Sequence, residues 1–346
     1  MALGGGRRGR SFLHNIFWEI INLENLFLAW KEFRKGKKER KDVQKFEFRL
    51  EDNLFLIHEE LKKKNYKHLP YTSFFIQDPK LRRINKATVR DRVVHQATFR
   101  ILYQIFDKTF FFDSYSCRLC KGNHGAVRRL ETFVRRSSRN YSRNIYVLKC
   151  DIKKFFDSID HQILLSLVKR KILDDNTNWL LEKIIYSFEK TKGKGLPLGN
   201  VTSQIFANIY LNELDYFVKH ELKVKYYIRY CDDFVILAEQ REILCLVTLQ
   251  INDFLKNVLK LELHENKIII RKPRQGVDFL GYVVLPHYKV LRTKTKRRIL
   301  KKLQKKRHEL ERGDISSISF HQSLQSYLGI LTHCKGFKVK KDLLSI

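Results

Sequence analysis

The chain has 346 residues, 43% of them hydrophobic and 12% aromatic, which is typical of a folded protein with a sizeable core. Its 69 Lys and Arg residues against 37 Asp and Glu give a formal charge of +32, and such an excess costs stability unless a polyanion neutralises it. Nucleic acid is therefore the first candidate partner, and a membrane surface is the second. No apolar run approaches the roughly 18 residues that span a bilayer, and the start lacks a signal-peptide core, so we expect a cytoplasmic protein without a membrane partner.

The cysteines are too sparse and too irregularly spaced for a disulfide framework in a chain of this length. Cys117 and Cys120, with His124 nearby, resemble half of a zinc site, but a second ligand pair at suitable spacing is missing. We therefore do not expect zinc. The six cysteines are Cys117, Cys120, Cys150, Cys231, Cys245 and Cys334.

The first part of the chain predicts helices around one basic hairpin. Residues 1–10 are rich in Gly and Arg, and Ser11 is a suitable cap for the helix that follows. Lys80, Arg82 and Arg83 lie on a predicted two-stranded flap, where they could hold a triphosphate. The predicted elements are the helices Ser11–Phe33, Leu50–Lys64 and Arg90–Phe106 and the flap from Tyr71 to Ile84.

At Ile145 the pattern changes to that of a buried strand that ends on Asp151. An acid at this place has a fixed backbone and a short reach, which suits metal coordination. The alternative role, capping the next helix, fits Ser158 or Asp160 better. Helices are predicted for 161–171 and 177–190, and a loop that contains Gly199 leads into a long helix to about Leu222. Gly199 permits close approach of the backbone to a ligand.

The segment from Tyr226 to Ala238 predicts a hairpin with Asp232 and Asp233 at its tip. Adjacent carboxylates raise each other's pKa unless a cation lies between them, so the pair indicates a divalent metal site. The alternative is an ordinary turn rich in Asp.

The rest of the chain predicts a helix over 239–259, a strand that begins at Lys267, and a hairpin whose strands are 277–284 and 287–291. The tail is predicted to be mostly helical. Ten of the sixteen residues from Arg292 to Arg307 are Lys or Arg. This density exceeds that of an ordinary solvated helix face and favours binding to a nucleic-acid backbone.

Asp151, Asp232 and Asp233 thus lie at the ends of separate predicted strands. The order of strand, two helices, hairpin, helix and strand allows these strands to be neighbours in one antiparallel sheet with helices behind it. The three acids could then converge on one edge and hold two divalent ions about 3.5 to 4 Å apart. Together with the charge, this arrangement indicates nucleotidyl transfer.

An ordered set of short motifs resembles those of reverse transcriptases. They are Asp78-Pro-Lys-x-Arg82, Arg90-Asp-Arg92, Asp151-x-x-x-Phe-Phe-Asp157, Leu198-Gly-x-x-x-Ser-Gln204, Tyr230-x-Asp-Asp233, Lys267 and Phe279-Leu-Gly281. The resemblance implies an α+β right-hand polymerase with fingers, a palm of antiparallel sheet backed by helices, and a short helical thumb. The implied divisions are a basic N-terminal extension and helix over 1–45, fingers with part of the palm over 46–144, palm over 145–291 and thumb over 292–346.

The resemblance also implies a role for each matching residue. Asp151 and Asp232 would bind two Mg²⁺ ions, or Mn²⁺, with Asp233 in support, and Lys267 would protonate the leaving pyrophosphate. Phe156 would lie under the sugar of the incoming nucleotide, where its bulk leaves no room for a 2′-hydroxyl. The remaining nucleotide-binding residues would be Lys80 and Arg82 on the triphosphate and Leu198, Gly199, Ser203 and Gln204 at the base.

Within the family, most members are similar to Gln-Gly-x-x-x-Ser-Pro at the motif where this chain has Leu198 and Gln204. With Ser114-Tyr-Ser-Cys117, this departure resembles the reverse transcriptases of diversity-generating retroelements. It implies error-prone copying of a template RNA, especially at adenines, from a nucleic-acid primer and dNTPs, together with a small accessory protein.

Three alternatives stay open. A retron or group II intron-type reverse transcriptase shares the same motifs, although the short tail and the Ser-Gln motif count against an intron protein. A catalytically idle, maturase-like RNA-binding factor is of a different class, and the presence of all three acids counts against it. Phe156 counts against an RNA-dependent RNA polymerase.

Overall fold

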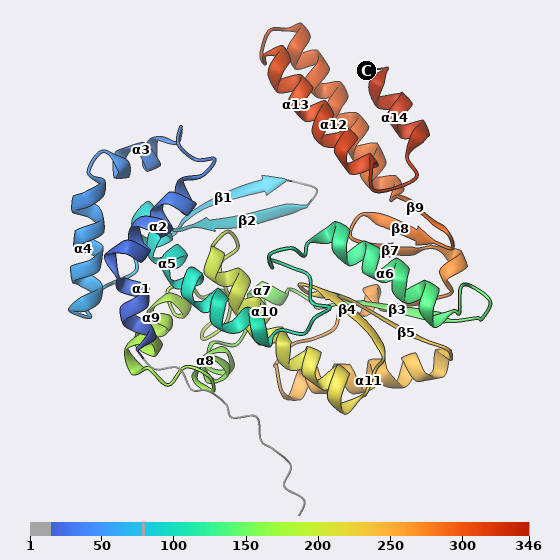
Figure 1. The fold of residues 1–346 in the computed structure, drawn as a ribbon, viewed down its shortest axis with the longest axis horizontal. Coiled ribbons are helices and arrows are strands. Elements are labelled where there is room, and N and C mark those ends of the chain that lie inside the picture. Colours follow the sequence, from blue (N-terminus) through green and yellow to red (C-terminus); the bar gives the residue numbers. More distant parts are fainter. Residues whose placement is uncertain (1–14, 78–79, 346) are drawn as a thin grey trace, which may run out of the picture. The chain divides into compact units, whose positions relative to one another are not determined.

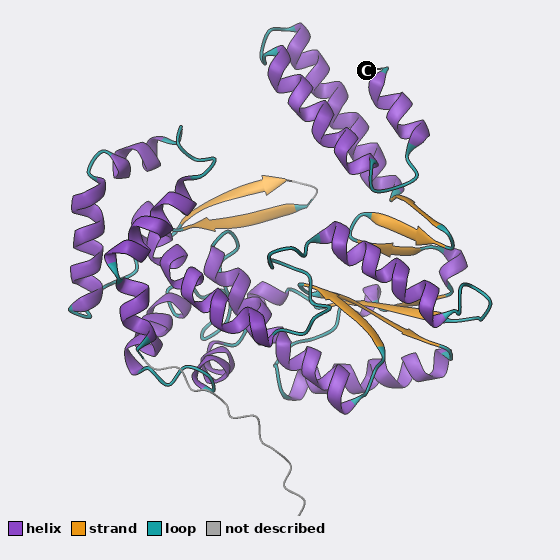
Figure 2. Ribbon diagram, viewed as in Figure 1, coloured by secondary structure: helices purple, strands orange, loops and turns teal. Residues whose placement is uncertain are grey.

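The computed structural model describes residues 15–77 and 80–345, and the chain divides into two compact units. Unit 1 consists of Met1–Phe111, Ile152–Phe217 and Asn252–Glu262, and unit 2 of Phe112–Asp151, Val218–Ile251 and Leu263–Ile346. The Gly- and Arg-rich start, the predicted cap Ser11, and Asp78 and Pro79 of the first motif lie outside the described residues. Figure 1 labels the elements of both units and Figure 2 colours them by type.

Unit 1 is mainly helical, and one expected helix is divided in two. The predicted helix up to Phe33 is interrupted at Asn22, which has extended backbone (ψ 134°) and whose side chain accepts a hydrogen bond of 2.8 Å from the Glu24 amide. Asn competes with helical hydrogen bonding in this way and so starts a new helix. The helices are α1 (Ile16–Ile21), α2 (Leu23–Arg34), α3 (Lys41–Glu47), α4 (Leu50–Lys62), α5 (Val89–Phe106), α7 (Phe155–Ser158), α8 (His161–Lys169), α9 (Asp175–Ile185) and α10 (Val201–Tyr216).

The flap of unit 1 is an antiparallel pair, β1 (Thr72–Gln77) and β2 (Leu81–Lys86), as the sequence predicts. The loop before α10 contacts this hairpin, because the Asn85 amide donates to the Leu198 carbonyl at 3.2 Å. Gly199 has φ of +113°, and a Cβ there would lie 3.1 Å from Ile84 Cγ2. The close approach that Gly199 permits is therefore to β2 of the protein itself.

Unit 2 contains a four-stranded antiparallel sheet in the order β4-β5-β3-β6. Its strands are β3 (Tyr146–Asp151), β4 (Tyr226–Tyr230), β5 (Asp233–Ala238) and β6 (Ile269–Arg271). Helix α6 (Asn123–Ser137) packs its apolar side, including Leu130 and Val134, onto Ile228 and Val235 of the sheet. The part of α11 (Arg241–Asn257) that belongs to unit 2 lies on the other side of the sheet (Figure 1). This antiparallel sheet backed by helices confirms the α+β class and fits a right-hand polymerase fold.

A second sheet of unit 2 differs from its prediction. The segment 277–284, expected as one strand, forms β7 (Val277–Phe279) and β8 (Tyr282–Leu285), and β9 (Tyr288–Leu291) follows. The chain reverses at Leu280 and Gly281, whose φ values are +50° and +88°. This left-handed backbone turns the chain after only three paired residues, so the expected hairpin is a three-stranded sheet.

The tail of unit 2 is helical, as predicted, with α12 (Thr293–Glu311), α13 (Ser317–Leu331) and α14 (Phe337–Leu344). Ile299 and Leu303 of α12 are buried against the other two helices and the core of unit 2, and Leu310 is partly buried. The basic residues of α12 leave only this narrow apolar stripe. In the described part of the chain no helix is long and apolar enough to cross a membrane.

Candidate active site

Two of the three predicted acids lie side by side on neighbouring strands of the sheet of unit 2. Asp151 ends β3 and Asp233 begins β5, and the two residues are direct partners in the antiparallel ladder. Direct partners project their side chains to the same face with Cβ atoms about 4.5 to 5.5 Å apart. The strand register therefore brings together two carboxylates that are far apart in the sequence, and like charges opposite each other are destabilising.

The third acid, Asp232, lies in the turn between β4 and β5. Cys231 in this turn has left-handed backbone with φ of +54°. Arg229, whose side chain is fully buried, donates from Nη1 to the Cys231 carbonyl at 3.1 Å. Burial raises the pKa of the Cys231 thiol well above its usual range, so this cysteine stays protonated and has no evident chemical role.

The electrostatics of the three carboxylates favour a cation. Burial, followed by the nearby charges of Asp151 and Asp233, raises the pKa of Asp232 to about 6. The pKa of Asp233 is also raised, chiefly by burial and by Asp151, against the opposing effect of lysines. Among the described residues Asp233 Oδ1 is a buried oxygen without a hydrogen-bond partner. Burying several carboxylates close together is unfavourable, and a bound cation would offset this cost.

Two lysines lie beside the acids. Lys267 Nζ donates to Asp151 Oδ1 at 2.5 Å, and Lys149 Nζ lies 3.6 Å from Asp233 Oδ1. Lys267 is in a 3₁₀ turn, Glu265–Lys267, just before β6 rather than on the strand as expected. Lys149 was not predicted as a site residue, although a residue two positions before Asp151 on a strand shares its face. Arg229 was not predicted either, and its only signal in the sequence is a cation inside an apolar strand.

The carboxylates fit a hard divalent cation, which prefers oxygen ligands. In the described residues no group of three or more His, Cys, Asp or Glu side chains is arranged as a ready metal site. The raised pKa of Asp232 and the Asp233 oxygen that lacks a hydrogen bond are nevertheless compatible with a cation-binding site. Cys117 and Cys120 of the considered zinc motif are exposed free thiols.

The other predicted site residues belong to unit 1. Lys80 and Arg82 are exposed at the end of the flap, and Phe156 on α7 is half-buried with its ring 5.3 Å from that of Phe155. At the start of α10, Ser203 is buried and Gln204 is exposed. The remaining two, Leu198 and Gly199, lie against β2. The structure thus joins Asp151, Asp232, Asp233 and Lys267 in unit 2, and joins the Leu198 loop to the flap in unit 1.

Residues 61–284 match the model of the family described as reverse transcriptase (RNA-dependent DNA polymerase). The protein YkfC of Escherichia coli is 26% identical over 275 residues, which cover 68% of this chain and 71% of YkfC. The group II intron-encoded protein LtrA of Lactococcus lactis is 26% identical over 304 residues, covering 67% of this chain and 49% of LtrA. A solved telomerase from Candida albicans, in complex with a fragment of telomeric RNA, aligns with a TM-score of 0.48 at 12% identity and covers 70% of this chain and 51% of its own.

Proposed function

The chain belongs to the reverse transcriptase family, and from this premise we propose that it copies an RNA template into DNA by two-metal nucleotidyl transfer. The observation that carries the proposal is the ladder pairing of Asp151 with Asp233 beside Asp232, inside the segment that matches the family. The formal charge of +32 supplies the attraction to a nucleic-acid template and primer.

In this proposal the chain has the family's divisions. The proposed divisions are a basic N-terminal extension and helix over 1–45, the fingers with part of the palm over 46–144, the palm over 145–291 and the thumb over 292–346. The basic side of α12 supports the assignment of the last division to a thumb that contacts nucleic acid, because a phosphate backbone is the partner that such a surface fits.

Asp151, Asp232 and Asp233 are the proposed ligands of Mg²⁺ or Mn²⁺. Bound divalent ions would activate the primer hydroxyl and neutralise charge on the departing pyrophosphate. Lys267 is the proposed proton donor to that pyrophosphate, and its amine is held at 2.5 Å by Asp151. Lys149 offsets part of the charge of Asp233, which supports its deprotonated form.

The nucleotide roles rest on the family resemblance. Lys80 and Arg82 would bind the triphosphate, for which exposed cations on a flap are suitable donors. Phe156 would exclude the 2′-hydroxyl and so select dNTPs. Leu198, Gly199, Ser203 and Gln204 would contact the incoming base and the template.

For the subclass we favour a diversity-generating retroelement, in which the enzyme works with a small accessory protein and copies adenines with errors. Most related enzymes resemble Gln-Gly-x-x-x-Ser-Pro at this motif, whereas this chain has Leu198 and Gln204 at its ends. This difference supports the assignment. The alternative is an intron-type enzyme or maturase, which the similarity to LtrA favours.

Primer extension on an RNA template tests the enzyme proposal. With Mg²⁺ and dNTPs, we expect the wild-type chain to extend a primer and to use rNTPs poorly. No product from the wild type, with RNA binding retained, would favour the idle RNA-binding factor. Preferential use of rNTPs would favour an RNA-dependent RNA polymerase.

Leu198→Gln tests the subclass. An additional hydrogen-bonding side chain at the base pair contributes about 1.4 kcal/mol, so we expect misincorporation opposite template adenine to fall roughly tenfold. The measurement is sequencing of cDNA made on a defined RNA, with errors opposite cytosine as an internal reference. Leu173→Gln, at an exposed leucine of unit 1, is the matched control and should leave the error spectrum unchanged. Unchanged adenine errors in Leu198→Gln would contradict the assigned role.

A further inference from the structure

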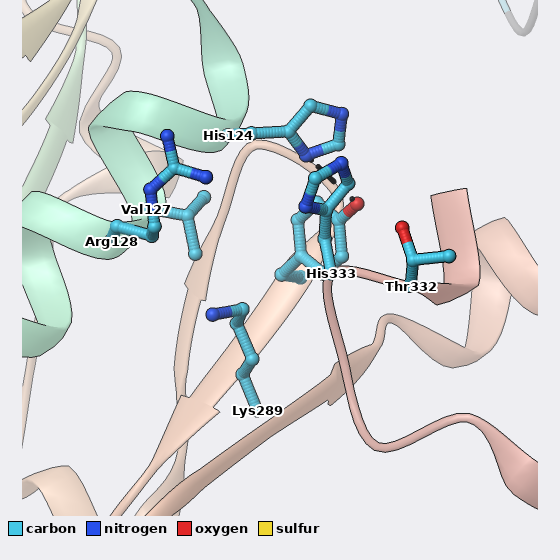
Figure 3. A pocket seen from close by; sticks show the side chains of 7 residues that line it. His124, Val127, Arg128, Lys289, Thr332 and His333 are labelled. Atoms are coloured by element: carbon cyan, nitrogen blue, oxygen red, sulfur yellow. Dashed lines mark hydrogen bonds between the residues drawn. The ribbon is translucent and has the colours of Figure 1, made fainter. Parts of the chain in front are cut away.

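Unit 2 contains a pocket of about 180 Å³ that the polymerase proposal does not use. It lies between the start of α6, strands β8 and β9, and the end of α13 with the loop after it (Figure 3). Its volume corresponds to several water molecules, enough for a small polar group. The pocket is lined by His124, Val127, Arg128, Tyr282, Lys289, Thr332 and His333.

Two histidines from distant parts of the chain form one wall. The rings of His124 and His333 stack with centroids 3.9 Å apart and planes at 29° (Figure 3). The Tyr282 hydroxyl donates to the Ile330 carbonyl at 3.3 Å and lies 3.2 Å from His124 Nδ1. Because the hydroxyl proton goes to the carbonyl, the hydroxyl accepts from Nδ1–H of His124, and this leaves Nε2 of that ring for a ligand.

The pocket has more positive than negative groups. Arg128 is exposed and forms no ion pair with any residue that the structure describes. Lys289 Nζ lies 2.6 Å from Glu131 Oε2, and no carboxylate is among the described residues that line the pocket. Burial, followed by His333, Arg128 and Lys289, lowers the pKa of His124. The positive charges of Arg128 and Lys289 disfavour protonation of His124, and an anion bound among these side chains would offset this effect.

We propose that this pocket binds a phosphate group. A tetrahedral oxyanion can accept from Arg128, from Thr332 and, once the rings are protonated, from the imidazole N–H groups, which all border the same space. Two sources share this chemistry, a backbone phosphate of bound nucleic acid and free phosphate or pyrophosphate. The backbone source rests on the proposed function and is supported by the basic helix α12 of the same unit.

Occupation of the pocket would fasten the helical tail to α6. The Lys335 amide already donates to the Lys289 carbonyl at 2.8 Å, which holds the loop after α13 against β9. A phosphate that accepts from both Arg128 and His333 would add a link from that loop to α6. The pocket would then couple binding of the strand to the position of α13 and α14.

Protonation gives the proposal a measurable signature. A phosphate beside His124 and His333 favours their charged forms and raises their pKa, so binding takes up protons. Affinity should therefore increase as the pH falls from 8 to 6. The charged and titratable groups that line the pocket with these rings are Arg128 on α6, Tyr282 on β8 and Lys289 on β9, and Lys289 is paired with Glu131 of α6.

The first experiment measures binding of a primer–template duplex by fluorescence anisotropy, without dNTPs and without Mg²⁺. Under these conditions a failure of polymerisation leaves the measurement unaffected. Arg128→Gln should lower the slope of log affinity against log salt by about 0.9, with roughly a three- to tenfold loss of affinity at physiological salt. Arg135→Gln removes the same charge from an exposed position of α6 outside the pocket and should change the slope less.

The second experiment follows the imidazole resonances of the full chain by NMR across pH. Duplex or inorganic phosphate should raise the pKa of His124 and His333, and the gain in affinity at pH 6 should be lost in His333→Gln. His321→Gln, at an exposed histidine of α13, is the matched control and should keep the gain. A pKa rise with duplex assigns the pocket to the nucleic-acid backbone, and a rise with inorganic phosphate alone assigns it to the free anion. If neither ligand moves these resonances and Arg128→Gln behaves like Arg135→Gln, the pocket does not bind phosphate.

Discussion

Asp232→Asn is expected to abolish DNA synthesis while it stabilises the metal-free protein. Loss of a proposed metal ligand should lower primer extension by at least ~10³-fold. The same change removes a buried carboxylate whose pKa is raised to about 6 by burial and by Asp151 and Asp233. Because each pKa unit corresponds to about 1.4 kcal/mol, the gain in unfolding free energy should be about 3 kcal/mol, or roughly 4 °C in melting temperature.

The pH dependence of this gain has a definite sign. The folded-state pKa of Asp232 lies above its ordinary value of 3.8, so the ionised group destabilises the fold. This cost is absent below about pH 4, develops between pH 4 and 6, and is complete above pH 6. The stabilisation by Asp232→Asn should therefore appear above pH 6 and vanish near pH 4.

Calorimetry in EDTA across pH measures the stability of the metal-free protein, and primer extension in Mg²⁺ measures DNA synthesis. Asp253→Asn, at an exposed aspartate of α11 with the same chemical change, is the control and should alter neither stability nor synthesis. An Asp232→Asn protein that melts below the wild type at pH 7.5 would contradict the electrostatic account. One that still extends primers would contradict the metal-binding role.

Phe156→Ala is expected to admit ribonucleotides. In the proposed role the ring excludes the 2′-hydroxyl by its bulk. The backbone of Phe156 on α7 is held by the segment before α10, since the Leu196 amide donates to the Phe156 carbonyl at 2.7 Å. Discrimination by shape in such a pocket is worth roughly 10- to 200-fold, so the ratio of rNTP to dNTP use should rise by that factor. Single-nucleotide incorporation with matched dNTP and rNTP measures this ratio.

Two controls distinguish a loss of sugar selection from a general loss of structure. Incorporation of dNTPs by Phe156→Ala should persist, because the three acids are unchanged. Phe48→Ala removes an aromatic ring that is 90% exposed in unit 1 and should keep the wild-type ratio. If Phe156→Ala loses dNTP and rNTP incorporation equally, Phe156 has a structural role and does not select the sugar.

The predictions from local pattern agree well with the structure. The hairpin around Asp232 and Asp233, the strand that ends on Asp151 and the basic flap all form as expected, because a period of two residues and a polar tip identify such strands. Two boundaries failed for local reasons that are visible only in backbone angles. Asn22 starts a new helix, and the left-handed Leu280 and Gly281 divide an expected strand.

The candidate site was predictable in part. The three acids and Lys267 follow from motif order, and the structure brings these four together. Lys149 beside Asp233 was missed because its strand pairs with segments far away in the sequence. Arg229 contacts the carbonyl of Cys231, only two residues away, but its burial depends on packing against distant segments such as the one that contains Asp113. The stacked pair of His124 and His333 could not be predicted either, since no local sequence pattern at one residue indicates contact with the other.

By itself the sequence determined the charge of the protein, the existence of its strands and hairpins, and the family to which its ordered motifs belong. These properties depend on composition and on neighbours within a few residues. The tertiary structure alone decided the register that places Asp151 opposite Asp233, the lysines beside these two carboxylates, and the pocket between α6 and the tail. A shift of one residue would turn every side chain of a strand to the other face, so this convergence depends on packing between distant segments of the chain.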